Sequence, residues 1–149
     1  MLALDQATKL WAAAALDYGV PVAVLPFFNL TLVHNTGAAF SFLADAGGWQ
    51  RPFFIVLSSV VSVVLIAWLR RLPPASRLLG VALALVLGGA VGNLVDRVAY
   101  GYVIDFVDLH AGGWHWPAFN VADSAISCGV VLLLVDGLFG GRGHGRSGE

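Results

Sequence analysis

The chain has 149 residues, of which 58% are hydrophobic and only 11% are charged, and its mean hydropathy is +0.82. Soluble domains are usually about 25% charged, so this composition excludes an ordinary soluble domain and favours an integral membrane protein. A net charge of −1 gives no reason to expect a nucleic-acid partner. Cys128 is the only cysteine, which excludes an intramolecular disulfide and a cysteine-based metal cluster.

The first apolar segment, about 1–16, predicts a short helix that Asp5 and Lys9 interrupt. Sixteen residues of helix rise about 24 Å, which is less than a hydrocarbon core of roughly 30 Å. The segment also lacks the basic start and the uninterrupted apolar stretch of a signal peptide. We therefore expect either an unusually short membrane helix or a natural start upstream of Met1.

Residues 20–45 predict a small β-sheet on the outer membrane surface. The stretches 22–25 and 28–33 are rich in β-branched and aromatic residues, and Pro26 separates them. A turn is expected at Asn35–Gly37. Three tryptophans suit anchoring at the membrane interface, namely Trp49, Trp114 and Trp116.

Three further apolar segments, at about 52–69, 78–96 and 121–139, have close to the 20 residues that a spanning helix needs. Together with the first segment they predict a mainly α membrane protein, a four-transmembrane-helix bundle with the small sheet on its outer face. We expect one membrane domain over residues 1–140. Small residues in the third helix predict a face for close helix contact, namely Gly88, Gly89 and Gly92.

Basic residues predict the orientation, because cytoplasmic loops are enriched in lysine and arginine. Five arginines flank the loop between the second and third helices or follow the fourth helix: Arg70, Arg71, Arg77, Arg142 and Arg146. Both termini are then cytoplasmic, and residues 17–51 and 98–120 lie on the outer side. The glycine-rich tail, 141–149, is expected to be disordered.

Three aspartates, Asp96, Asp105 and Asp123, occur at or just beyond the outer ends of the last two helices. Acidic side chains are costly at such positions, which favours a functional role. Asn120 is a good N-cap and places Asp123 in the first helical turn. If the two helices are antiparallel neighbours, Asp123 can meet Asp96 or Asp105. Two adjacent carboxylates can share a proton, so that one activates water while the other polarises a peptide carbonyl.

A structural alternative gives the same residues no catalytic role. Asp96 and the adjacent Arg97 then form an ion pair at the helix end, Asp123 caps its helix, and Asp105 lies in a polar loop. We expect the Asp96–Arg97 ion pair even if the other two aspartates are catalytic. Three other aspartates are expected to be ordinary loop charges, namely Asp17, Asp45 and Asp108.

Other chemistries fit the sequence less well. Cys128, between Ser127 and Gly129, is expected at a helix contact rather than as a reactive thiol. Histidines are scattered without the spacing of zinc ligands, so no metal site is expected. A small proton-coupled carrier or channel subunit would use intramembrane carboxylates, but the inverted repeats and broken helices typical of carriers are missing from the sequence. A non-enzymatic membrane scaffold is the third alternative.

Five sequence blocks, in order along the chain, resemble lipoprotein signal peptidase, the type II signal peptidase of bacteria. They are residues 5–9 (DQATK), 35–40 (NTGAAF), 88–97 (GGAVGNLVDR), 103–106 (VIDF) and 119–124 (FNVADS). The resemblance implies a membrane aspartyl endopeptidase that removes the signal peptide from prolipoproteins carrying a diacylglyceryl group on the lipobox cysteine, cutting just before that cysteine. It implies a monomer in the bacterial inner membrane, surrounded by lipids, with its site near the outer leaflet and with no cofactor or metal.

The resemblance also chooses between the aspartates: it assigns the catalytic pair to Asp105 and Asp123. It assigns supporting or substrate-positioning roles to a further set, namely Asp5, Lys9, Asn35, Gly37, Asn93, Asp96, Arg97 and Asn120. One departure from the family lies at the N-terminus, where only four residues precede Asp5.

Overall fold

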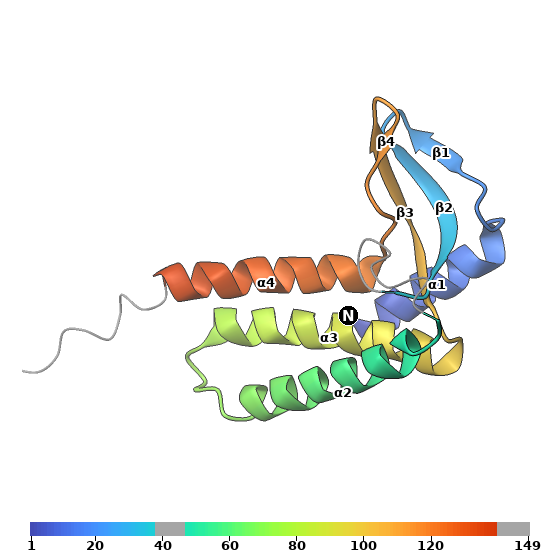
Figure 1. Cartoon of the computed structure of the whole chain (residues 1–149). Coiled ribbons are helices and arrows are strands. Elements are labelled where there is room, and N and C mark those ends of the chain that lie inside the picture. The colour runs from blue at the N-terminus through green and yellow to red at the C-terminus, as the bar shows by residue number, and fades with distance from the viewer. Residues whose placement is uncertain (38–46, 140–149) are drawn as a thin grey trace, which may run out of the picture.

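The computed structural model describes residues 1–37 and 47–139. Figure 1 shows helices α2, α3 and α4 running side by side, with a small sheet and the short helix α1 gathered at one end. Helix α3 packs between α2 and α4. The helices are α1 (Leu2–Ala15), α2 (Gln50–Leu69), α3 (Arg77–Ala99) and α4 (Val121–Phe139).

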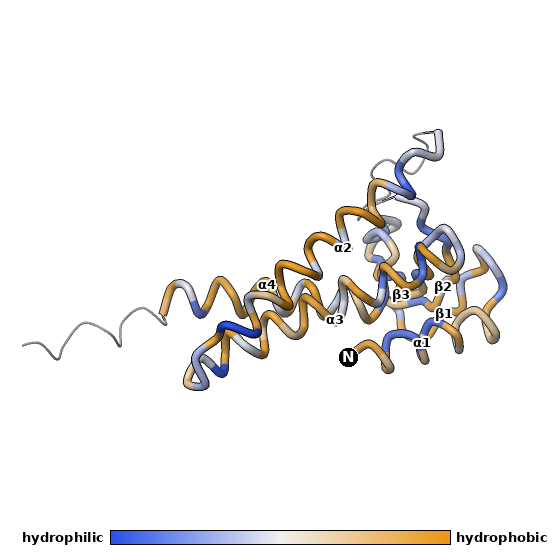
Figure 2. Tube along the Cα trace, turned by 90° about the horizontal axis from the view of Figure 1, so that it is seen from below, coloured by the Kyte–Doolittle hydropathy of each residue, from blue (hydrophilic) through white to orange (hydrophobic). Residues whose placement is uncertain are grey.

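Three helices, α2, α3 and α4, are long and apolar enough to cross a membrane. Their bounds agree within about three residues with the segments predicted from hydropathy. Figure 2 shows that most of the trace along these helices is hydrophobic. Helix α1 has 14 residues and is not among the three in the described part of the chain. The structure therefore supports a mainly helical membrane fold with three apolar helices and a small sheet.

Glycines bring α3 close to its neighbours, as predicted from the small residues near its outer end. A Cβ built on Gly89 would collide with the carbonyl oxygen of Ala122, at the start of α4. A Cβ on Gly129, in α4, would lie 2.6 Å from Cγ2 of Val86. A Cβ on Gly92 would lie 2.5 Å from a carboxylate oxygen of Asp5. These contacts leave no room for a side chain, so the glycines set the helix spacing.

Helix α1 buries its polar residues and exposes its apolar ones. Asp5, Lys9 and Ala12 are its buried residues, whereas Leu10 and Trp11 are more than half exposed. This pattern is the reverse of a helix on a water-soluble domain, and it suits a helix whose outer face meets lipid. The polar face of α1 contacts α3, α4 and the sheet.

The sheet has four antiparallel strands in the order β1-β2-β3-β4. They are β1 (Val22–Leu25), β2 (Phe28–Asn35), β3 (Val103–Ala111) and β4 (Trp114–His115). The two stretches predicted as strands form β1 and β2. No strand was predicted in the outer segment 98–120, but it contains the nine-residue strand β3. The rest of the predicted sheet region, 38–45, and the tail 141–149 lie outside the described residues.

The pairing of β2 with β3 contains an irregularity. Leu30 faces Val107 and Val33 faces Asp105, so Thr31 and Leu32 together face the single residue Phe106. One extra residue in one strand is the mark of a β-bulge. Strands β3 and β4 are joined at Gly112 and Gly113, whose φ angles of 58° and 83° fit the two central positions of a type I′ hairpin turn.

Candidate active site

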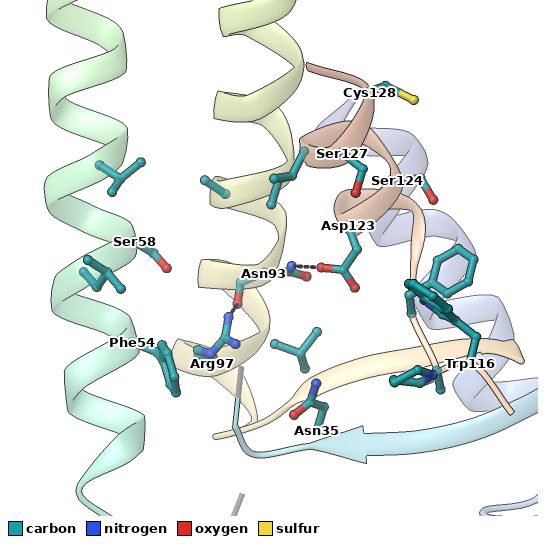
Figure 3. A pocket seen from close by; sticks show the side chains of 18 residues that line it. Asn35, Phe54, Ser58, Asn93, Arg97, Trp116, Asp123, Ser124, Ser127 and Cys128 are labelled. Atoms are coloured by element: carbon teal, nitrogen blue, oxygen red, sulfur yellow. Dashed lines mark hydrogen bonds between the residues drawn. The ribbon is translucent and has the colours of Figure 1, made fainter. Parts of the chain in front are cut away.

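The first turn of α4 holds Asp123 through reciprocal capping. The side-chain oxygen of Asn120 accepts a hydrogen bond from the backbone N–H of Asp123 at 2.9 Å, and the backbone N–H of Asn120 donates to Oδ2 of Asp123 at 3.2 Å. This arrangement is a capping box, which confirms Asn120 as the N-cap. The amide of Asn93, on α3, donates to Oδ1 of Asp123 at 2.7 Å (Figure 3). The capping box and Asn93 together fix the direction of this carboxylate.

Asp105 lies on β3 and is 1% exposed. Nδ2 of Asn120 donates to its Oδ1 at 2.7 Å, and Nδ2 of Asn35 donates to its Oδ2 at 3.1 Å. Burial, and then the charge of Asp123, raise the pKa of Asp105 to about 7, against the opposing effect of these two hydrogen bonds. Asp105 therefore carries a proton for a large part of the time at neutral pH.

An asparagine, and not a cation, connects the carboxylates of Asp105 and Asp123. Asn120 contacts both carboxylates, one with its side chain and the other with its backbone N–H. Within the described ranges, the ion pairs shorter than 4 Å involve neither acid. The sequence left two possible partners for Asp123, namely Asp96 and Asp105. In the structure, Asp105 lies close enough to Asp123 for the charge of Asp123 to raise its pKa.

A buried lysine holds the third aspartate. Nζ of Lys9 lies 2.9 Å from Asp5, 3.0 Å from Asp96 and 2.9 Å from the amide oxygen of Asn93. These three contacts use all three N–H groups of the ammonium. Lys9, Asp5 and Asp96, which we call the lysine cluster, are each no more than 1% exposed.

The lysine cluster ties four elements together. Asp96 also accepts hydrogen bonds from the backbone N–H of Ile104, in β3, at 3.0 Å and from Gln6, in α1, at 2.9 Å. Asp5 accepts a hydrogen bond from the backbone N–H of Ala122, at the start of α4, at 2.9 Å. Gln6 belongs to the first of the five sequence blocks, but no role was predicted for it.

The prediction of an ion pair between Asp96 and Arg97 is wrong. Adjacent residues on a helix point in different directions, so the two side chains diverge. Arg97 instead donates to the carbonyl oxygen of Gly37 at 2.9 Å and lies over the ring of Phe54, 5.1 Å from its centroid. The partner of Asp96 is Lys9, from a helix about 90 residues earlier in the chain.

A pocket of about 740 Å³ opens between α2, α3 and α4. Figure 3 shows Asp123 facing it, with Arg97 and Phe54 on one side and Trp116 on another. Asp105 is not among the lining residues, but Asn35, which donates to Asp105, is. Most of the remaining lining is apolar or small and includes Leu57, Val61, Ala90, Ile126 and the stretch Trp116–Phe119.

The structure brings together all the supporting residues named from the sequence. Asn35, Asn93, Asn120 and the lysine cluster surround the two acids, and Gly37 joins Asn35 to Arg97, since its N–H donates to Oδ1 of Asn35 at 2.9 Å. No group of three or more histidine, cysteine or acidic side chains in residues 1–37 and 47–139 is arranged to hold a metal ion.

Two expectations about other residues are wrong. Asp108 is not a loop charge, because it lies on β3, is 7% exposed and accepts hydrogen bonds from Asn29, Thr31 and His115. The alternation of the sequence around it was the available signal for a strand. Cys128 is exposed and lines the pocket, while its neighbour Gly129 makes the helix contact.

Known proteins share both the sequence and the fold of this chain. The model of the family Signal peptidase (SPase) II matches residues 1–139. A lipoprotein signal peptidase of Acinetobacter baumannii is 56% identical over 93% of this chain and 78% of its own length. That of Paraburkholderia phymatum is 53% identical over 96% of this chain and 86% of its own.

A solved bacterial membrane enzyme has the same fold, with a TM-score of 0.85 and 32% identity, over 99% of this chain and 88% of its own. These likenesses do not favour the carrier or channel alternative. The chain belongs to the signal peptidase II family, and it is a multi-pass membrane protease.

Proposed function

We propose that this chain is an aspartic endopeptidase that cleaves the signal peptide from diacylglyceryl-modified prolipoproteins, just before the lipidated cysteine, with Asp105 and Asp123 as its catalytic pair. The observation that carries the proposal is the contrast in the surroundings of the buried acids. Asp5 and Asp96 are bound to Lys9, whereas Asp105 and Asp123 share Asn120 without a cation. Acids placed in this way can exchange a proton with a substrate.

The raised pKa of Asp105 suits it to hold the proton before the reaction. Asp123 faces the pocket and takes a proton from a water molecule, whose oxygen attacks the carbonyl carbon of the scissile peptide. Asp105 gives its proton to the carbonyl oxygen. The tetrahedral intermediate then breaks at the C–N bond: Asp123 returns its proton to the leaving nitrogen, and the carbonyl reforms as a hydroxyl proton passes back to Asp105. No metal or cofactor takes part in these steps.

The pocket suits a substrate that is apolar along most of its length and polar at one peptide bond. Its lining from α2 and from the stretch Trp116–Phe119 is mainly apolar, while its charged and amide side chains lie toward one end (Figure 3), namely Asn35, Asn93, Arg97 and Asp123. Arg97 and Asn35 line this polar end, where their N–H groups can bind substrate carbonyl oxygens. Asn35 also donates to Asp105, so it connects the pocket with the buried member of the pair.

We further propose a topology in the bacterial inner membrane. Helix α1 is the first of four spanning helices in a single peptidase domain, 1–140, both termini are cytoplasmic, and 141–149 forms a disordered cytoplasmic tail. The α2–α3 connection, with Arg70, Arg71 and Arg77 beside it, lies at the end away from the sheet (Figure 1), which supports this orientation. The active site then lies near the outer leaflet. A C-terminal reporter that is active only in the periplasm should stay silent, and an active reporter would reject this topology.

The proposed activity can be tested directly. The protein is purified in detergent and mixed with a diacylglyceryl prolipoprotein, without added metal or nucleotide, and release of the signal peptide is followed. The wild type should cleave the lipidated substrate, while an otherwise identical protein with Asp105→Asn should bind it and leave it intact. Absence of cleavage by folded wild type, or near-full activity of Asp105→Asn, would reject the proposal.

A further inference from the structure

The buried Asp108 and the His115 side chain, which is 54% exposed, form a second polar site on the far part of the sheet. Nδ1 of His115 lies 2.7 Å from Oδ1 of Asp108. The other oxygen, Oδ2, accepts hydrogen bonds from Asn29 at 3.1 Å and Thr31 at 3.3 Å. These bonds lower the pKa of Asp108 even though burial alone would raise it. The carboxylate is therefore a fixed, charged acceptor for the imidazole.

The ring of His115 is held from a second side. It stacks on the ring of His110, its cross-strand partner, with 5.0 Å between the ring centroids and 23° between the planes. Asp108 and His110 are both on β3, so His115 is bound twice to the same strand. A histidine held in this way fixes the end of β4.

The chain that follows His115 directly forms one wall of the pocket. Trp116, Pro117, Ala118 and Phe119 all line it, and we call this stretch the pocket wall. The backbone N–H of Trp116 donates to the carbonyl oxygen of Leu109 at 2.7 Å, and that of Phe119 donates to Val107 at 3.1 Å. Leu109 and Val107, which accept these two hydrogen bonds, are the neighbours of Asp108.

We propose that Asp108 and His115 are positioning residues for the substrate: their hydrogen bond fixes the pocket wall against β3, and so sets the affinity for the lipidated segment of a prolipoprotein. The inference rests on the proposed function, because that function names the occupant of the pocket. Neither residue lines the pocket, and neither is bonded to Asp105 or Asp123. Loss of the bond should therefore weaken substrate binding and leave the chemical step intact.

The main experiment measures kcat and KM for cleavage of a diacylglyceryl prolipoprotein. His115→Ala should raise KM about tenfold, the size expected from one lost hydrogen bond to a charged group, with kcat within about twofold of wild type. His115→Asn should restore most of the loss, because its amide N–H lies near the position of Nδ1. Asp108→Ala should match His115→Ala, and the double variant should add little, since both remove the same bond.

His34→Ala is the matched control. His34 lies on β2 of the same sheet and stacks on Tyr102, with 3.9 Å between ring centroids, but it does not line the pocket. Its removal deletes an imidazole of equal size without touching the pocket wall, so KM should stay at the wild-type value. An equal rise in KM for His34→Ala would mean that any loss from the sheet weakens binding, and would overturn the inference.

Binding is also measured in the Asp105→Asn background, where cleavage is not needed. The dissociation constant of the prolipoprotein should rise by the same factor when His115→Ala is added. His115→Phe, which keeps a ring against His110 but has no N–H for Asp108, serves where His115→Ala does not fold. An unchanged dissociation constant or KM, or a fall in kcat alone, would overturn the positioning role. A wild type that binds but never cleaves would instead reject the proposed function and leave the binding comparison standing.

Discussion

The lysine cluster and the aspartate pair Asp105–Asp123 are both buried acidic sites between the same helices, but only one contains a cation. In the lysine cluster, one ammonium contacts two carboxylates. In the aspartate pair, amides supply the contacts from side chains, and burial raises the pKa of Asp105 to about 7. A contacting cation favours the charged form of an acid, whereas burial and a neighbouring carboxylate favour the protonated form, as they do at Asp105. The lysine cluster is suited to stabilising the packing of the helices, and the aspartate pair is suited to proton transfer.

Asn93 joins the two sites, and Lys9 sets its orientation. The oxygen of the Asn93 amide accepts hydrogen bonds from Lys9 at 2.9 Å and from Asn120 at 3.2 Å, while its nitrogen donates to Asp123 at 2.7 Å. A flipped amide would turn its N–H groups toward the lysine and its oxygen toward a carboxylate. The lysine cluster thereby controls which group of Asn93 faces the carboxylate of Asp123.

The largest expected effect separates the acids by role. Asp105→Asn and Asp123→Asn should each lower kcat by about 10²- to 10⁴-fold, because each removes one proton-transfer group, while the protein still folds in detergent. Steady-state kinetics with the lipidated substrate checks this. Asp17→Asn, at an exposed position, is the control and should keep full activity. An equal fall in kcat in all three variants would show that Asp105 and Asp123 do not differ in role from an exposed aspartate.

Lys9→Met should destabilise the protein by about 3 to 5 kcal/mol, because two buried carboxylates lose the cation that contacts them both. Thermal unfolding in detergent measures the loss. Leu10→Met, at an exposed position on the same helix, should leave the unfolding temperature unchanged. A stable Lys9→Met protein would show that the cluster does not hold the helices together.

Gly92→Ala should cost about 1 to 3 kcal/mol, since its Cβ would lie 2.5 Å from the Asp5 carboxylate and push it from Lys9. Gly137→Ala is the matched control, because a Cβ there meets nothing within 4 Å and alanine favours a helix. Comparison of their denaturation midpoints tests the close packing of α1 on α3. Equal midpoints for the two variants would contradict it.

The smallest effect is a shift in pH dependence. Activity needs the proton on Asp105, so kcat/KM should fall as the pH rises through about 7. Asn120→Ser keeps a capping oxygen but loses the N–H bonded to Asp105, a bond that lowers the pKa of Asp105. The alkaline limb should therefore move to higher pH, by a fraction of a unit.

Asn29→Ser makes the same change at a buried asparagine that contacts Asp108 instead, and it should leave the alkaline limb in place. A shift to lower pH in Asn120→Ser would reverse the assigned sign. An equal shift in both variants would show that the limb does not report on Asp105.

The three long helices and strands β1 and β2 could be predicted from sequence, because apolar length and β-branched composition are local signals. The capping of Asp123 by Asn120 was equally local. Strand β3 was underestimated, since its polar residues, Asp105 and Asp108, resembled those of a loop. Both are buried only because β2 and the helices supply partners for them.

Long-range pairing could not be predicted from the residues alone. Sequence adjacency suggested Arg97 as the partner of Asp96, whereas folding brings in Lys9. The roles of Lys9 and Asn35 came from the family resemblance, and their contacts became visible only in three dimensions. The link from Asp108 to the pocket wall depends on a hairpin whose register is set by the Gly112–Gly113 turn, a local signal that the prediction did not use.

The irregular pairing of β2 with β3 has a consequence for how one strand serves two acids. Asp105 and Asp108 are three residues apart and so lie on opposite faces of β3, while Asn29 and Asn35, six apart, would share one face of a regular β2. The extra residue at Thr31–Leu32 reverses the alternation between the two asparagines. Asn29 therefore reaches Asp108 on one side of the sheet, and Asn35 reaches Asp105 on the other. Because of the bulge, the single strand β2 supplies amide donors to acids on both faces of the sheet.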